Sequence, residues 1–188
     1  MKDLIVPTPL HRLIYFGEQV DQETIANIAI KILEINESDD TIKKVSRIQG
    51  FKYKPKPINI YIDSYGGSVY QIFGLISLIE NSKTTVYTYV TGTAQSAAFL
   101  LFLSGGKRFI YSMSTLMYHQ ISNFSYGKVK DMEDDLKETL RLQKQMDDYV
   151  MNRTKITREE LDINFKTKTD WILTPKDCIQ YNIASKII

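Results

Sequence analysis

A strand followed directly by a helix is predicted by the stretch Ile58-Asn59-Ile60-Tyr61-Ile62-Asp63-Ser64-Tyr65-Gly66-Gly67-Ser68-Val69. Isoleucine occupies every second position from Ile58 to Ile62, which is the period of a strand with one buried face. Ser68 then stands where a helix N-cap is favoured. An apolar stripe at helical spacing follows it: Ile72, Leu75, Ile76 and Ile79. The two elements together indicate an α/β fold.

Strands and helices continue to alternate in both directions along the chain. Strands are predicted over 11–16, 85–91, 107–111 and 115–118, and helices from Asp21 to Ile35, over 97–103 and over 128–153. Thr157 and Thr174 begin two further helices by their capping patterns. The polar residues 36–57 are expected to form a long loop or an insertion. This alternation is typical of an α/β fold with a largely parallel sheet.

Composition restricts the classes of function. The 188 residues include 24 Lys and Arg against 22 Asp and Glu, and a net charge of +2 disfavours a protein that binds nucleic acid mainly through phosphates. Cys178 is the single cysteine, and His11 and His119 are the only histidines, which disfavours disulfide and zinc sites. No apolar run approaches the roughly 20 residues that cross a membrane, and no secretory signal is visible. We expect a cytoplasmic globular protein without a bound metal.

Ser96 is the candidate nucleophile and His119 the candidate general base. Small residues surround Ser96 in Gly92-Thr93-Ala94-Gln95-Ser96-Ala97-Ala98, between a predicted strand and an apolar helix, so the backbone can turn sharply there. A helix N-cap is the structural alternative for Ser96. His119 follows the predicted strand 115–118, at the end where parallel sheets form ligand crevices. A histidine with a satisfied hydrogen bond is the alternative for His119, and these patterns do not choose the carboxylate that would orient it.

The paired glycines Gly66 and Gly67 indicate a turn in which the backbone comes close to a substrate. Such a turn allows a backbone N–H to point at a bound carbonyl oxygen. Phosphate-binding loops also use glycines, but the Walker lysine-serine pair and the G-x-G-x-x-G spacing are both absent from the chain. Nucleotide binding is therefore not expected.

Taken in this order, the segments resemble the proteolytic subunit of the Clp protease, a serine peptidase of the crotonase-like fold. The resemblance extends from about His11 to Ile187. Its motifs are Leu13-Ile14-Tyr15-Phe16-Gly17, the stretch 58–69, the run 92–101, Gly106-Lys107-Arg108-Phe109, Met117-Tyr118-His119-Gln120 and the tail 170–183. It implies a single peptidase domain over 1–188, built as a repeated β-β-α superhelix. A short N-terminal segment over 1–10 and a long protruding handle helix at about 128–153 belong to the same expectation.

The resemblance also implies a role for each site residue. Ser96 matches the family's nucleophile, His119 its general base and Asp170 the acid that orients the histidine. The backbone N–H groups of Gly67 and Ala97 match the oxyanion hole. The matching substrate-binding positions are Gly66, Ser68, Val69, Gln120 and Ile121. The family generally has proline where this chain has Tyr65 and Ile121, so a different peptide groove is expected.

Members of this family assemble with themselves into two stacked seven-membered rings. A ring-shaped ATPase unfoldase feeds them unfolded protein or peptide. The resemblance therefore implies these partners, with no cofactor at the catalytic centre and no ATP bound by this chain. Two alternatives remain open at this point: a catalytically modified or structural ring subunit of the same fold, and a crotonase-type acyl-CoA enzyme. The complete Ser, His and Asp set favours the peptidase.

Overall fold

A largely parallel β-sheet forms the centre of the protein. The computed structural model describes residues 10–188, and within that range the sheet has seven strands in the order β1-β2-β3-β4-β7, with β5 paired to β3 and β6 paired to β5. The strands are β1 (Leu13–Phe16), β2 (Ile58–Ser64), β3 (Val86–Gln95), β4 (Lys107–Ile110), β5 (Thr115–Tyr118), β6 (Trp171–Leu173) and β7 (Lys186–Ile187). Every pair is parallel except β5 with β6. The predicted α/β fold with a largely parallel sheet is confirmed.

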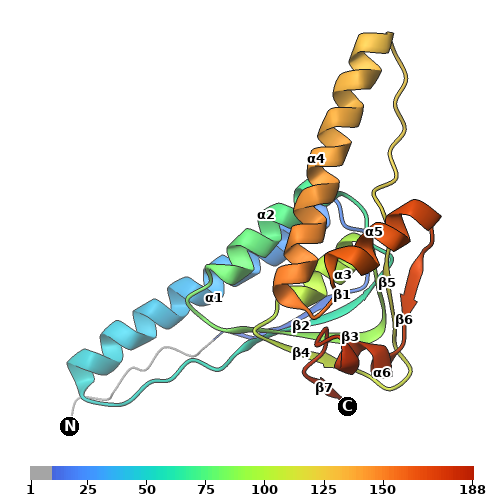
Figure 1. Ribbon diagram of the computed structural model, residues 1–188. Helices are drawn as coiled ribbons and strands as arrows, with labels where there is room; N and C mark the ends of the chain where they lie inside the picture. Colours follow the sequence, from blue (N-terminus) through green and yellow to red (C-terminus); the bar gives the residue numbers. More distant parts are fainter. Residues whose placement is uncertain (1–9) are drawn as a thin grey trace.

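Helices cover one face of the sheet (Figure 1). They are α1 (Gln22–Gln49), α2 (Val69–Glu80) and α3 (Ala97–Leu103). The alternating isoleucines of β2 are buried in the same hydrophobic cluster as the inner faces of α1 and α2, and every residue of α3 is buried. Burying this apolar surface, at about 25 cal/mol per Å², is the main force that holds helices and sheet together.

The strands also carry a row of aromatic rings across β2, β3 and β4. The rings of Tyr61 and Tyr89 stack with centroids 4.6 Å apart, and those of Tyr89 and Phe109 stack 4.8 Å apart. These residues alternate with the buried positions of their strands and are themselves only partly buried. The row therefore lies on the opposite face of the sheet from α1, α2 and α3, since successive side chains of a strand point to opposite faces.

Helix α1 is longer than the sequence predicted, and the loop expected over 36–57 was wrong for its first part. The helix begins after the predicted N-cap, Asp21, and ends at Gly50, which has a left-handed φ of 73°. Beyond Ile35 the buried face continues through Asp39, Ile42 and Ser46. Two of these three residues are polar, so the apolar stripe is interrupted although the helical spacing persists.

The C-terminal part of the chain contains α4 (Val129–Arg153), α5 (Arg158–Thr167) and α6 (Pro175–Gln180). The predicted capping box forms at Thr157, and the predicted helix start at Thr174 is confirmed and has a capping box as well. Cys178 is buried inside α6. The segment after β5 runs outward beside α4, which starts at its far end and returns to the body (Figure 1). This is the protruding helix predicted over about 128–153.

The structure also bears on two expectations about the chain as a whole. No described helix is long and apolar enough to cross a membrane. The expected N-terminal segment 1–10 lies outside the described residues except for Leu10.

Candidate active site

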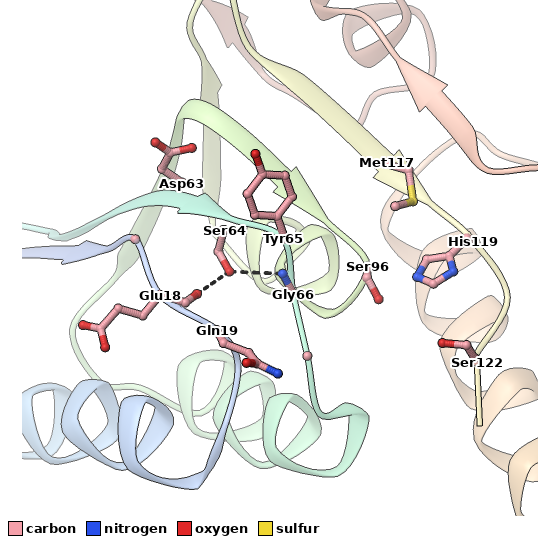
Figure 2. Close-up of a pocket in the computed structure, with 12 residues that line it drawn as sticks. Glu18, Gln19, Asp63, Ser64, Tyr65, Gly66, Ser96, Met117, His119 and Ser122 are labelled. Carbon is pink, nitrogen blue, oxygen red and sulfur yellow. Dashed lines mark hydrogen bonds between the residues drawn. The ribbon is translucent and has the colours of Figure 1, made fainter. Parts of the chain in front are cut away.

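A pocket of about 730 Å³ lies where β2, β3 and β5 end (Figure 2). Ser96, His119 and the glycine pair Gly66-Gly67, all predicted site residues, line it together. The rest of the wall comes from the loop after β1, from residues 63–65 and from Met117 and Ser122. The carboxyl ends of parallel strands thus bring separate parts of the sequence to one cavity, as the sheet topology requires.

Ser96 forms the sharp turn between β3 and α3. Its φ is 53° and its ψ is −123°, a backbone conformation that costs a residue other than glycine roughly 1–3 kcal/mol. The Ser96 N–H donates to the carbonyl of Met117 at 2.9 Å, and the Ser96 carbonyl accepts from the N–H of Phe99 at 3.0 Å. The Ser96 side chain makes no capping hydrogen bond. Ser96 therefore occupies the N-cap position of α3 without capping it through its side chain, and the residue lines the pocket.

Gly66 brings the β2–α2 turn against Ser96. Its φ is 99°, and a Cβ atom at this position would lie 2.6 Å from the carbonyl oxygen of Gln95. The same atom would lie 2.9 Å from Ser96 Cβ and 3.0 Å from the backbone nitrogen of Ala97. A side chain at position 66 would push the two turns apart, so glycine is required for this close approach.

Gly67 continues the same turn beside the loop after β1. Its φ is 148°, and a Cβ atom here would lie 2.3 Å from the carbonyl oxygen of Val20. That oxygen accepts from the N–H of Ser68 at 2.8 Å, while the Val20 N–H donates to Gly66 at 2.8 Å. The backbone of this turn is therefore fixed on both sides. A fixed backbone also holds the N–H of Gly67 itself in place, as stabilisation of a developing oxyanion by this group needs.

His119 is the first residue after β5. Strands β3 and β5 are parallel with Gln95 opposite Met117, so the residues that follow each strand lie side by side. In Figure 2 the His119 ring faces the hydroxyl of Ser96. Within the described part of the chain no hydrogen bond joins these two side chains. Such bonds are often long without substrate and tighten when the substrate binds.

Asp170, the residue just before β6, does not line the pocket. Strands β5 and β6 are antiparallel, with Tyr118 opposite Trp171. The pairing ends at this pair, and His119 and Asp170 are the adjoining residues of the two strands. In residues 10–188 the Asp170 carboxylate, which is exposed, makes no hydrogen bond to the histidine.

A second pocket of about 340 Å³ adjoins the first and shares Gly67 and Ser122 with it. Three of the predicted substrate-binding residues, Ser68, Val69 and Ile121, line this second pocket, whereas Gln120 lines neither. The Ser68 hydroxyl accepts from the N–H of Gln71 at 3.4 Å and so caps α2. The Ile121 N–H donates to Gln143 Oε1 at 2.7 Å. Both groups thus have partners inside the chain.

Glu138 of α4 forms the opposite wall of the second pocket. Its carboxylate accepts two hydrogen bonds from the Arg141 guanidinium, at 2.7 and 2.8 Å, and one from the Tyr70 hydroxyl at 2.7 Å. The bonds from Arg141, followed by the bond from Tyr70, lower the pKa of Glu138 to about 2. Glu138 therefore gives this wall a negative charge at neutral pH.

Comparison with known proteins identifies the family of the chain that forms this pocket. A family model described as Clp protease matches residues 9–188, which is nearly the entire chain. The chain belongs to the Clp protease family.

Relatives of this Clp-type peptidase resemble it along most of its length. The ATP-dependent Clp protease proteolytic subunit of Porphyromonas gingivalis is 28% identical over 181 residues, which are 95% of this chain and 74% of that protein. A proteolytic subunit 1 from Prochlorococcus marinus subsp. pastoris is 27% identical over 179 residues, 94% of this chain and 83% of the relative. The solved structure of a ClpP1 mutant from Listeria monocytogenes has a TM-score of 0.77 at 22% identity, and the match covers 94% of this chain and 91% of the other. The likeness confirms the Clp protease fold.

Some pocket residues of this Clp-type peptidase were not predicted, among them Asp63. The Asp63 carboxylate accepts from the N–H of Thr93 at 2.8 Å. It lies against Gly92, where a Cβ atom would be 2.4 Å from Asp63 Oδ1. A glycine inside a strand pattern often marks a place where another group comes close to the backbone, so Gly92 was the sequence signal that could have pointed to Asp63. Because Asp63 is held in this way, it supports the pocket wall.

The chemistry available in the pocket of the Clp-type peptidase follows from these groups. A serine hydroxyl faces an imidazole, and the backbone of a fixed glycine turn lies beside the serine. Within residues 10–188, no three His, Cys, Asp or Glu side chains converge as metal ligands. The arrangement suits acyl transfer to a hydroxyl, with a nitrogen base to accept the proton.

Proposed function

We propose that this chain is a serine endopeptidase subunit that cleaves peptide bonds through Ser96, His119 and Asp170. The observation that carries the proposal is the backbone of Ser96, held at a φ of 53° so that its hydroxyl lies in the pocket with the ring of His119. Strained nucleophiles at strand-to-helix turns are found where the surrounding structure serves catalysis. The register of β5 and β6 supports Asp170 as the partner of His119.

In this proposal His119 accepts the proton of the Ser96 hydroxyl as the oxygen attacks the carbonyl carbon of the scissile bond. The backbone N–H groups of Gly67 and Ala97 bind the oxyanion that forms. The protonated histidine then donates its proton to the leaving amine, and the peptide carbonyl remains on Ser96 as an ester. Water, deprotonated by His119, hydrolyses that ester. Asp170 holds the imidazole in the required tautomer and stabilises its positive charge.

Labelling with a fluorophosphonate tests the nucleophile. The wild-type protein should become covalently labelled at Ser96, whereas Ser96→Ala should not. Ser104, a buried serine of the same region, gives the matched control, because Ser104→Ala leaves the pocket unchanged. Absence of labelling in folded, assembled wild-type protein would instead favour a structural ring subunit, and equal labelling of Ser96→Ala would refute the assignment.

Hydrolysis of a fluorogenic peptide tests the acid. Asp170→Asn keeps the shape of the side chain but stabilises the wrong tautomer of His119, so kcat should fall by about 10⁴. Asp162→Asn, on the exposed side of α5, is the control and should leave kcat unchanged. Activity of Asp170→Asn within tenfold of wild type would remove Asp170 from the mechanism.

We further propose that the whole chain forms one peptidase domain and that its copies stack as two seven-membered rings. Support comes from α4, which protrudes from the body with an exposed apolar stripe: Val129, Met132, Leu136 and Leu140. An apolar stripe on a projecting helix requires a partner surface. The names of the relatives, which call those proteins ATP-dependent, support an ATPase unfoldase as the supplier of unfolded protein or peptide.

Light scattering tests the assembly. The measured mass of the wild-type protein should be that of a complex of many copies. The double variant Leu136→Asp/Leu140→Asp should have a lower mass, because the rings separate. Lys137→Asn, on another side of the same helix, should leave the mass unchanged. An active protein that remains monomeric would contradict the proposed rings.

A further inference from the structure

A group of polar side chains, three of them buried and the arginine partly exposed, lies where α4 joins the body, next to the pocket. It consists of Tyr118 at the end of β5, Gln143 and Asp147 of α4, and Arg158 at the start of α5, and we call it the polar brace. Tyr118 donates a hydrogen bond to Asp147 Oδ1, and Gln143 Nε2 donates to the same oxygen at 2.9 Å. Arg158 donates to Asp147 Oδ2 at 3.0 Å. Both oxygens of the carboxylate are therefore engaged.

The polar brace holds the chain on both sides of His119. On one side, the Tyr118 hydroxyl is bonded to Asp147 and also accepts from Gln143 Nε2 at 3.3 Å. On the other side, the N–H of Ile121 donates to Gln143 Oε1 at 2.7 Å. The segment 118–121, which carries the histidine, is thus tied at each end to one turn of α4.

The sheet does not supply this restraint. Strand β5 ends at Tyr118, and its pairing with β6 ends at the same residue. Within residues 10–188, His119 and Gln120 make no backbone-to-backbone hydrogen bond. After Tyr118 the first main-chain group with a partner is the N–H of Ile121, and that partner is the Gln143 side chain. The path of the backbone through His119 consequently depends on α4.

Burial makes the polar brace rigid. Tyr118, Gln143 and Asp147 are 2%, 7% and 8% exposed. Burial and the neighbouring Asp147 carboxylate both raise the pKa of the Tyr118 phenol, so the hydroxyl stays protonated and continues to donate. In such a network each group depends on the others, because a buried donor or acceptor that loses its partner is not compensated by water.

We propose that Gln143 and Asp147 are positioning residues for His119, which they hold in line with Ser96 through Tyr118 and Ile121. The proposal rests on the proposed role of His119 as the general base. Neither side chain lines either pocket, so loss of the polar brace should act mainly on the rate of the chemical step, and on KM only as far as Ile121 moves. Misplacement of a reacting group by about 1 Å can cost about 10²-fold in rate.

Steady-state peptide hydrolysis by Gln143→Leu tests this directly. Leucine fills the same space but cannot accept from Ile121 or donate to Asp147, so kcat should fall by about 10- to 100-fold while KM stays within about twofold. Gln145→Leu is the matched control, since Gln145 lies two residues further on the exposed side of α4 and bonds only Arg141 among the described side chains. It should keep wild-type kcat.

Asp147→Asn and Asp148→Asn provide a second matched pair. Both aspartates bond Arg158, but only Asp147 reaches Tyr118. Asp147→Asn should lower kcat by about tenfold, and Asp148→Asn should not change it. A merely structural role for Asp147 would lower the unfolding midpoint of the assembled protein without changing kcat per folded active site, which titration with the fluorophosphonate counts.

Reversal of the hydrogen bonds supplies a rescue. Gln143→Glu alone sets two carboxylates against each other and should be slow. Gln143→Glu combined with Asp147→Asn reverses the bond, because the amide introduced at position 147 donates to the carboxylate introduced at position 143. Tyr118 tolerates the reversal because a hydroxyl both donates and accepts. The double variant should therefore recover most of the lost kcat.

The outcomes separate this proposal from the one on which it rests. Wild-type labelling at Ser96 together with unchanged kcat in Gln143→Leu and Asp147→Asn would overturn the positioning role and leave the peptidase intact. Absence of Ser96-dependent labelling in the wild-type protein would overturn the proposed function itself. A reduced kcat in either variant, with KM preserved and recovery in the double variant, would establish the positioning role.

Discussion

Two aspartates of this protein, Asp39 in α1 and Asp147 in α4, have nearly the same surroundings at opposite ends of the sheet. Each is a buried helical carboxylate that accepts hydrogen bonds from one arginine, one tyrosine and a third polar side chain. The partners of Asp39 are Arg12, Tyr53 and Thr84, and those of Asp147 are Arg158, Tyr118 and Gln143. The two clusters differ in the exposure of the arginine, 9% for the Arg12 side chain and 41% for that of Arg158, and in which part of the strands they touch.

The Asp39 cluster lies at the amino ends of the parallel strands. Arg12 precedes β1, Thr84 precedes β3, and Tyr53 belongs to the segment that leads from α1 to β2. The Asp147 cluster lies at the carboxyl end of β5, where the pocket opens. Parallel sheets bind ligands at their carboxyl ends. The same set of bonds is thus expected to secure the fold at one end and to set the geometry of catalysis at the other.

Asp39→Asn should have the largest effect on stability and none on catalysis. It leaves the guanidinium of Arg12, whose side chain is 9% exposed, without its negative partner, and breaking a buried pair in this way costs roughly 3 kcal/mol. Urea unfolding at fixed protein concentration measures the loss, and fluorophosphonate labelling should show an unchanged rate per folded molecule.

The adjacent Asp40 is the matched control for this change. Its salt bridge with Lys83 is solvent-exposed, so Asp40→Asn should leave the unfolding midpoint where it was. Equal losses of stability in the two variants, or slower labelling in Asp39→Asn, would remove the distinction between the two ends of the sheet.

Acid should abolish the contribution of the Asp39 carboxylate to the free energy of unfolding. Burial by itself raises the pKa of this carboxyl, but hydrogen bonds from Arg12, Thr84 and Tyr53 outweigh burial and lower it. A carboxyl with a lowered pKa in the folded state stabilises the protein above its unfolded pKa, near 3.9, and loses that effect as the pH falls through the folded value. The stability gap between wild type and Asp39→Asn should therefore narrow below about pH 4. Unfolding curves at pH 7 and pH 3 that keep the same gap would contradict this.

Removal of the tyrosine hydroxyls should have the smallest effect on stability and the sharpest contrast in function. Tyr53→Phe and Tyr118→Phe each delete a hydrogen bond to a carboxylate and should each cost about 1.5 kcal/mol, less than Asp39→Asn. Only Tyr118→Phe should lower kcat, because only Tyr118 adjoins His119. Parallel measurement of unfolding and peptide hydrolysis checks both. A kcat loss in both variants would mean that stability alone controls activity.

The sequence predicted most elements of the fold because apolar spacing and caps signal them locally. Alternating isoleucines identified β2, and threonine capping patterns identified the starts of α5 and α6. The second half of α1 was not predicted as helix because Asp39 and Ser46 occupy buried positions of its inner face. A polar residue counts as exposed in any periodicity argument, and the partners that make its burial favourable are distant in sequence.

The sequence predicted those site residues whose own position in the strand and helix pattern indicates a function. Ser96 and His119 followed from their places at the ends of predicted strands, and both line the pocket. Asp170 depended on the resemblance to a family, and its role stays a prediction. Gln143 and Asp147 gave no signal, because glutamine and aspartate on a charged helix ordinarily face water. Only the packing of α4 against β5 distinguishes them.

The hydrogen bond from the Ser96 N–H to the Met117 carbonyl has a consequence for how this protein tolerates change. It belongs to the ladder between β3 and β5, and a ladder is made of main-chain groups that every residue except proline supplies in full. Side chains along both strands, Tyr118 excepted, can therefore be exchanged, provided they pack, while the backbone of Ser96 keeps its place against the end of β5. Redesign of substrate preference should thus succeed at the lining positions without moving the nucleophile, as long as the polar brace is kept.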